Sequence, residues 1–310
     1  MSTDPIRRRV CQTHWSSTAL ASPVMARIAL VTATAALGTD EDLEPLLDAL
    51  ARRGIDAEAP CWDDAEVEWE AFDLAVLRST WDYVPRYDEF LRWLDATEAR
   101  VQVLNPATVV RWSTNKRYLA DLGGRGVPVV PTEFFEPGAA PPQLSTHEGE
   151  LVVKPVVSAG SKDTARHSDM RVAEQHVADL LGANRAVMVQ PYLHGIDTHG
   201  ETGLVYFDGK LSHAFRKAPI LALDAPPTVE FFAPEEITAR EATDDERRVA
   251  DATIAGCGGA DLLYGRVDLV PGPDGRPVVL EVELAEPSFF LGQAPGSADR
   301  FAVAAEQRLA

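Results

Sequence analysis

The sequence predicts an α/β domain with a parallel, doubly wound sheet, followed by an α+β region built on antiparallel sheets. Between residues 25 and 114, apolar strands alternate with amphipathic helices, which is typical of a parallel sheet covered by helices. Farther along, strand-like segments flank the dipeptides Asp208-Gly209 and Asp274-Gly275, which favour tight hairpins. A chain of 310 residues is also long enough for two or three connected domains.

The first region contains strands and helices in alternation. "RIALVTA" (27–33) indicates a buried strand, and residues 39–54 indicate a helix that is capped by Thr39 or Asp40 and ends at Gly54. "FDLAVLRS", "YDEFLRWLDATEA" and "VQVLN" then predict a strand, a helix and a short strand. No GxGxxG motif follows the first strand, so a dinucleotide site is not predicted there.

The pattern of predicted helices and strands changes near Asn115. A helix that ends at Gly123 or Gly124 is followed by strand-like segments, with only one strong helix, "DMRVAEQHVADLLG", between them. This pattern favours antiparallel sheets. Residues 1–24, which precede the first strand, are too polar for a secretory signal and are expected to form a disordered extension.

The composition is that of a folded, acidic protein. The formal net charge of −19 opposes binding to nucleic acid or anionic membranes, because such polyanions attract an excess of Lys and Arg. No apolar run is long enough to span a bilayer. Cys11, Cys61 and Cys257 are odd in number, widely scattered and without CxxC spacing, so they suggest neither a disulfide framework nor a zinc site, which fits a reducing cytoplasm. A phosphate-bearing small molecule is still compatible with this net charge, because a few local cations can outweigh the overall field.

Three carboxylates fall on two strands that are predicted to pair. A two-residue turn at Asp274-Gly275 places Asp268 opposite Glu281 and Arg266 opposite Glu283, all on one face of the hairpin. Three acids so close together require a cation, and Mg²⁺ that also touches a substrate phosphate is a common one. The alternative is a solvated acidic strand face, and a different register would separate the groups.

The same reasoning applies to the Asp208-Gly209 turn, which predicts that Arg216 lies opposite Glu201. Taken alone, this is a structural cross-strand pair. Beside a metal and a phosphate, Arg216 becomes a candidate clamp for transferring negative charge.

Four motifs occur in an order that resembles the ATP-grasp superfamily of carboxylate–amine ligases. They are "NKRYLADLGGRGVPVVPTEFF", "LVVKP" with a Ser/Gly loop, "VMVQPYL", and "RVDLV" followed by "LEVEL". The resemblance covers roughly Leu104 to Leu291. It implies a Rossmann-like pre-ATP-grasp domain at residues 25–114 and an ATP-grasp fold with two antiparallel-sheet subdomains, at residues 115–192 and 193–310. "LRSTWDY", "KPVVSAGSKDTAR", "FDGKLSHAFRKAP" and "EVELAEPSFFL" are most similar to the D-cycloserine-forming group, which cyclises O-ureido-D-serine with ATP.

The resemblance implies a nucleotide site. Lys116 and Lys154 match the lysines that reach ATP phosphates, and an unpaired ammonium is costly to bury in an apolar strand. The loop "SAGSKDTAR" would close over the γ-phosphate, because small residues let backbone N–H groups approach the oxygens. The remaining matches are Ser158, Gly160 and Ser161 in that loop, Gln190 and Leu193 at adenine, and Asp197 at the ribose. For Gln190 an ordinary strand end, and for the loop a plain flexible hairpin, are the alternatives.

The resemblance also implies metal and catalytic residues. Asp268, Glu281 and Glu283 match the ligands of what are expected to be two Mg²⁺ ions, although the commoner family pattern has Asn in place of Glu283. The expected catalytic residues, which stabilise phosphoryl charge, are Lys154, Arg216 and Arg266. Independently of the resemblance, Arg78, Trp81 and Tyr83 follow the strand "DLAVL" at the carboxyl end of its sheet, where ligands bind, and are candidates for substrate binding. Arg78 is the candidate that would hold a substrate carboxylate bidentately. Interdomain core is the alternative for the two aromatic residues.

The expected function is a cytoplasmic ligase in which a substrate carboxylate attacks the γ-phosphate of ATP and an amine then displaces phosphate. If the cycloserine resemblance holds, both groups belong to one molecule and the product is a ring. One alternative is an intermolecular ligase that forms a dipeptide-like or glutathione-like bond. Another is a regulatory protein that binds ATP without turnover. A homo-oligomer remains open.

Overall fold

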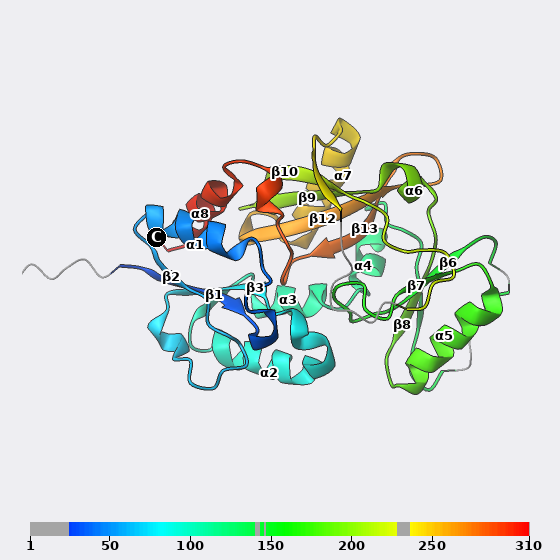
Figure 1. Cartoon of the computed structure of the whole chain (residues 1–310), viewed down its shortest axis with the longest axis horizontal. Helices are drawn as coiled ribbons and strands as arrows, with labels where there is room; N and C mark the ends of the chain where they lie inside the picture. Colours follow the sequence, from blue (N-terminus) through cyan, green and yellow to red (C-terminus); the bar gives the residue numbers. More distant parts are fainter. Residues whose placement is uncertain (1–24, 140–142, 146, 228–235, 310) are drawn as a thin grey trace, which may run out of the picture.

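The computed structural model of the chain describes residues 25–139, 143–145, 147–227 and 236–309, which contain three sheets (Figure 1). The extension expected at residues 1–24, with Cys11, lies outside the described residues. In the view of Figure 1, the amino-terminal sheet is at the left, the largest sheet at the upper centre and a small sheet with helix α5 at the right. None of the helices in the described ranges is long and apolar enough to cross a bilayer.

The first sheet is parallel throughout, as predicted. Its four strands run in the order β2-β1-β3-β4, and the central strands β1 and β3 are almost fully buried. The strands are β1 (Arg27–Thr32), β2 (Asp56–Glu58), β3 (Leu74–Ser79) and β4 (Gln102–Leu104). The helices of this region are α1 (Leu43–Arg52), α2 (Tyr87–Glu98) and α3 (Ala107–Ser113). Continuous apolar strands fold in this way because helices cover both faces of a parallel sheet.

Helix α1 begins later than predicted. Its N-cap is Asp42, with no side-chain capping bond, so the predicted cap at Thr39 or Asp40 is wrong. The Asp42 carboxylate instead accepts hydrogen bonds from the backbone N–H groups of Phe289 (2.6 Å), Phe290 (3.0 Å) and Leu291 (2.7 Å). These acceptors satisfy donors of a distant loop, and they therefore join the first sheet to the carboxyl-terminal part of the chain.

Replacing Asp42 by asparagine should lower the free energy of unfolding by about 2 kcal/mol, because the amide cannot accept all three bonds and buried donors lose their partner. Equilibrium unfolding in urea measures this loss. Asp48→Asn, on the exposed face of the same helix, is the matched control and should change stability by less than about 0.5 kcal/mol. Equal effects of the two variants would contradict the structural role of Asp42.

The second sheet has five antiparallel strands in the order β11-β10-β9-β12-β13. They are β9 (Glu201–Phe207), β10 (Lys210–Lys217), β11 (Ile237–Arg240), β12 (Tyr264–Pro271) and β13 (Pro277–Glu283). Two helices accompany this sheet, α7 (Asp244–Cys257) and α8 (Ser297–Gln307). Helix α8 lies beside α1, and one hydrophobic core includes residues of the first sheet, of β9 and of α8 (Figure 1).

The expectation of only one strong helix in the second region is therefore wrong. Helix α7 was detectable, because Thr243 and Glu246 in "TDDE" form a capping box at its start. The apolar positions of α7 are few, and most of its surface is charged, so the hydrophobic pattern alone is weak.

Two β-bulges decide which side chains face each other. In β12 and β13, Asp268 lies opposite Glu281 and Arg266 opposite Glu283, as predicted. The two-residue turn that predicted this pairing is wrong, however, because Pro271 pairs with Pro277 and a bulge after Asp268 restores the register. In β9 and β10, a bulge between Leu211 and His213 shifts the register by one residue.

The third sheet is small and antiparallel, with the order β5-β8-β6-β7. Its strands are β5 (Glu133–Phe135), β6 (Leu151–Pro155), β7 (Ala165–His167) and β8 (Val187–Pro191). Helix α5 (Met170–Gly182) packs Ala173 and Val177 against Leu151 and Val153 of this sheet. The shorter helices α4 (Tyr118–Gly124) and α6 (Gly195–His199) lie between the larger elements.

Candidate active site

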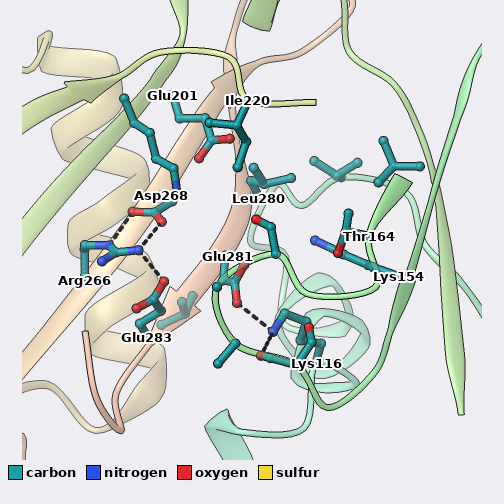
Figure 2. Close-up of a pocket in the computed structure, with 18 of the residues that line it drawn as sticks. Lys116, Lys154, Thr164, Glu201, Ile220, Arg266, Asp268, Leu280, Glu281 and Glu283 are labelled. Atoms are coloured by element: carbon teal, nitrogen blue, oxygen red, sulfur yellow. Dashed lines mark hydrogen bonds and ion pairs between the residues drawn. The ribbon is translucent and has the colours of Figure 1, made fainter. Parts of the chain in front are cut away.

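One cavity is bordered by both antiparallel sheets and by the first region of the chain. Strands β6 and β8 and the loop at residues 157–164 contribute to its wall, as do β12, β13 and the segment that follows β13. Trp81 and Tyr83, which follow β3, line it from the first region, and Gln190 and Leu193 line it from β8 and the segment after β8. Figure 2 shows the charged side chains that converge in this cavity.

Most of the predicted nucleotide residues line this cavity. They are Lys116, Lys154, Ser158, Gly160, Ser161, Gln190 and Leu193. The loop that carries Ser158 has left-handed backbone at Gly160 (φ 60°), where glycine is favoured, and also at Ser161 (φ 58°). Gln190 is buried, and its amide donates to Thr132 Oγ1 (2.9 Å). This hydrogen bond holds the end of β8 in place, and Gln190 also lines the cavity.

Two lysines reach the cavity from different elements. Lys154 on β6 is only 7% exposed, and burial lowers the pKa of its ammonium group, against the attraction of Glu281. Lys116 donates to the backbone oxygen of Ser158 (2.9 Å) and pairs with Glu281 (2.8 Å). The lysines therefore put positive charge on the side of the cavity that faces the carboxylates (Figure 2).

The carboxylates of β12 and β13 share one wall with Arg266, which lies between two of them (Figure 2). Arg266 donates to both oxygens of Asp268 (2.9 and 2.8 Å) and also bonds to Glu283. Burial raises the pKa of Glu283, and the charges of Asp268 and Glu281 add to this rise, whereas Arg266 opposes it. Burial also favours a raised pKa for Glu281. The positive charges of Lys116 and Lys154 have the larger, opposite effect, so the pKa of Glu281 is lowered.

The donor chemistry fits Mg²⁺, although Asp268, Glu281 and Glu283 do not lie together as one group of ligands. Among the described residues, no three His, Cys, Asp or Glu side chains are grouped at metal-binding spacing. The physical reason is that Asp268 and Glu283 form ion pairs with Arg266, whereas Glu281 forms an ion pair with Lys116. Nucleotide-bound Mg²⁺ commonly needs only one or two carboxylates, because phosphates supply further ligands, so Glu281 and Glu283 meet this requirement.

The predicted pairing of Arg216 with Glu201 is wrong. Because of the bulge in β10, Lys217 faces Glu201, and Arg216 faces Thr202. A shift of one residue exchanges the two faces of a strand. Lys217 and Glu201 line the cavity, whereas Arg216 is not among its lining residues and donates to the backbone oxygen of His199 (2.8 Å).

Glu201 introduces a pH dependence. Burial raises its pKa from 4.5 to about 7, against the attraction of Lys217. A carboxyl group whose pKa rises on folding stabilises the folded state at a pH below its pKa in the unfolded chain. This stabilisation is lost as the pH rises through its pKa in the folded protein. Between pH 5 and pH 8, without nucleotide, Glu201→Gln should therefore become more stable relative to the unaltered protein by about 2 kcal/mol.

Urea unfolding at both pH values tests this shift. The exposed Glu66→Gln is the matched control, and its difference from the unaltered protein should not depend on pH. A Glu201→Gln difference that stayed constant between pH 5 and pH 8 would contradict the raised pKa.

Asp197, the predicted ribose carboxylate, lies in α6 and is not among the cavity-lining residues. Its carboxylate accepts from the Tyr192 hydroxyl (2.5 Å) and pairs with Arg166 (3.2 Å). Its neighbour Ile196 lines the cavity instead. Asp197 therefore lies next in sequence to a cavity-lining residue, but its own side chain is bound by Tyr192 and Arg166.

The three candidate substrate residues divide into two groups. Arg78 is fully buried, pairs with Asp40 (3.2 Å), donates to the backbone oxygen of Pro287 (2.7 Å) and does not line the cavity. Its position does not fit the predicted contact with a substrate carboxylate, because its charge is used to join the segment before α1 to the segment after β13. Trp81 and Tyr83 line the cavity and also belong to the core of the first region.

Sequence reasoning missed three charged residues of the cavity: Glu201 as a wall residue, Lys217 and Glu286. The bulge in β10 concealed Lys217, although "FRK" carries two adjacent cations. Glu286 follows the "EVE" strand directly and could have been included as the next acid along the chain.

Similarity to known proteins is consistent with this geometry. Residues 28–105 match the family model of the N-terminal domain of D-cycloserine synthetase DcsG. The whole chain is 42% identical, over 306 residues, to the cycloserine biosynthesis protein DcsG of Streptomyces lavendulae, and the match covers 92% of this chain and 99% of that protein. The chain belongs to the DcsG family. The expected resemblance to D-cycloserine-forming ligases is therefore confirmed.

Solved structures extend the relationship from the DcsG family to the wider fold. The crystal structure of D-cycloserine synthetase DcsG has a TM-score of 0.84 at 40% identity and covers 92% of this chain and 100% of that one. D-alanine–D-alanine ligase of Bacillus anthracis, solved with ATP, has a TM-score of 0.63 at 15% identity, covering 91% and 95%. The ATP-grasp ligase PsnB, solved with Mg and ADP, has a TM-score of 0.62 at 20% identity, covering 92% and 99%. The last two show a shared ATP-grasp fold.

Proposed function

We propose that the protein is an ATP- and Mg²⁺-dependent cyclo-ligase that acts on an amino-acid derivative such as O-ureido-serine. The observation that carries the proposal is the 42% identity to DcsG of Streptomyces lavendulae over nearly the whole of both chains. The cavity supports it, because lysines and carboxylates from two sheets converge there. As part of the same proposal, we assign the parallel sheet to a Rossmann-like pre-ATP-grasp domain and keep the predicted subdomain boundaries.

The proposed reaction has two steps. A substrate carboxylate oxygen attacks the γ-phosphorus of ATP, the bond to the β-phosphate oxygen breaks, and ADP and an acylphosphate form. A nitrogen of the same substrate then attacks the acyl carbon, loses a proton and displaces phosphate, which closes a ring through a C–N bond. Most of the catalysis in such a transfer is alignment and charge stabilisation.

The chain's own residues suit these tasks. Lys116, Lys154 and Lys217 present positive charge to phosphate oxygens, while the loop with Ser158 and Gly160 offers backbone donors. Arg266 keeps Asp268 and Glu283 in place and adds charge near the transferring group. When Mg²⁺ is bound, it neutralises phosphate charge, and Glu281 and Glu283 are the residues that would hold it. Gln190 and Leu193 would border the adenine.

Arg216 and Asp197 do not line the cavity and are left out of this assignment, and Arg78 is left out of the substrate site. The cytoplasmic location, the number of metal ions and a homo-oligomeric state remain predictions. An intermolecular ligase is the second candidate among enzymes, and a dependence on a separate amine would favour it.

The test is release of ADP and phosphate from ATP and Mg²⁺ by the full-length protein, with and without O-ureido-D-serine, its L enantiomer and a panel of amino acids. We expect stimulation by an O-ureido-serine and a cyclic product in the mass spectrum. Glu281→Gln is the matched inactive control, because it keeps the shape of the side chain and removes its charge. Tight ATP binding with no stimulation by any compound would instead favour the regulatory alternative.

A further inference from the structure

Glu286 is the carboxylate of the cavity that has no cation. Glu281 pairs with Lys116, Arg266 bonds to Asp268 and Glu283, and Lys217 lies opposite Glu201. Within the described ranges, no Lys, Arg or His nitrogen lies within ion-pair distance of the Glu286 carboxylate, although the side chain is only partly exposed and lines the cavity. Burial raises the pKa of Glu286, against a hydrogen bond from Tyr83 and the charge of Lys116.

The backbone around Glu286 is held by an unbroken series of side-chain donors. Four consecutive carbonyl oxygens, those of residues 285–288, each accept a hydrogen bond from a different side chain. The donors, in that order, are the Tyr264 hydroxyl (2.6 Å), the Trp81 indole (2.9 Å), Arg78 (2.7 Å) and Arg266 (3.0 Å). A segment fixed at four successive carbonyls presents its side chain in one orientation, which is what a preorganised binding site requires.

Glu286 lies at the end of the cavity formed with the first region of the chain. Trp81, Tyr83, Ser113 and Thr114 line the same cavity from that region, whereas Gln190 and Leu193 border it from the third sheet and the segment that follows β8. The Glu286 backbone oxygen accepts from the Trp81 indole, so a group bound beside Glu286 would lie next to residues of the first region. Aromatic side chains there also suit a cation, because ring faces carry negative charge.

We propose that Glu286 binds the α-ammonium group of the amino-acid substrate. This inference rests on the proposed function and names the group that the same site recognises. A partly buried carboxylate without a cation is costly, and a ligand that supplies the missing ammonium removes that cost. The same pairing would hold the substrate by one end while its carboxylate faces the lysines and the nucleotide.

Calorimetric titration of the full-length protein, with ADP and Mg²⁺ present, tests the assignment. The probes are O-ureido-D-serine, its L enantiomer, a panel of α-amino acids and 3-(ureidooxy)propanoate, which lacks the amine. Glu286→Gln should weaken binding of the favoured amine compound about 100-fold and change binding of the compound without the amine less than about threefold.

The outcomes separate this inference from the proposed function. Glu66→Gln is the surface control, and unchanged affinity of Glu286→Gln for ADP checks that the cavity is intact. Turnover of an O-ureido-serine with equal affinity in Glu286→Gln and the unaltered protein would overturn the role of Glu286 and leave the ligase function standing. Selective loss of amine binding without any turnover would support the subsite and overturn the ligase function. Failure of the unaltered protein to bind any α-amino compound would overturn both.

Discussion

Replacing Lys154 by methionine should lower kcat for substrate-stimulated ADP release by about 10³-fold, because a donor aimed at developing phosphoryl charge is lost from a dry site. The fold should persist. Methionine matches the length of the lysine side chain and removes a buried ammonium whose desolvation is unfavourable. Steady-state kinetics with varied ATP, together with urea unfolding, measure both effects.

Lys210→Met provides the matched control for this substitution, since the Lys210 side chain is 79% exposed on β10 and lies outside the cavity lining. It should keep full activity. A Lys154→Met protein that lost activity and several kcal/mol of stability together would indicate a structural lysine. A fully active one would remove Lys154 from the catalytic assignment.

Replacing Arg266 by methionine should lower the free energy of unfolding by about 3–5 kcal/mol, because it leaves two carboxylates in a low-dielectric wall without their cation. Arg266 is 4% exposed and bonds to both oxygens of Asp268 as well as to Glu283. Urea unfolding without nucleotide or metal measures the loss.

A double-mutant cycle makes this second test specific. Adding Asp268→Asn to Arg266→Met should recover about half of the lost stability, because one uncompensated charge disappears. Arg276→Met removes a surface ion pair with Asp274, in which Arg276 is 81% exposed, and should cost less than about 1 kcal/mol. A loss in Arg266→Met as small as that of this control would show that the carboxylates do not depend on Arg266.

Local sequence patterns were sufficient for most strands and several helices. The apolar runs of β1 and β3 predicted parallel strands, and glycine stops predicted the ends of α1 and α4. Alternation along β12 and β13 put Arg266, Asp268, Glu281 and Glu283 on one face. These features depend on the period of the side chains and on local backbone preferences, which are encoded within a few residues.

The positions of individual charges were harder to predict. A single bulge in β10 put Lys217 in the cavity in place of Arg216, and nothing in "KLSHAFRK" marks that bulge. Asp40 was predicted as a helix cap, yet its carboxylate pairs with Arg78, and the neighbouring Asp42 accepts from the loop at residues 289–291. A carboxylate accepts hydrogen bonds from the donors that packing places beside it. These donors can come from distant parts of the chain, so the local sequence does not identify them.

By itself, the sequence determined the order of the sheets along the chain, the family resemblance and most of the lysines and acids that line the cavity. Only the tertiary structure decided which of those charges meet. Arg78 donates to the backbone oxygen of Pro287, and Asp197 pairs with Arg166 outside the cavity lining. Among the described residues, Glu286 is the cavity carboxylate without a cation. The reason is physical: side-chain period and turn preference act over a few residues, whereas electrostatic pairing depends on distances set by packing of segments up to about 250 residues apart.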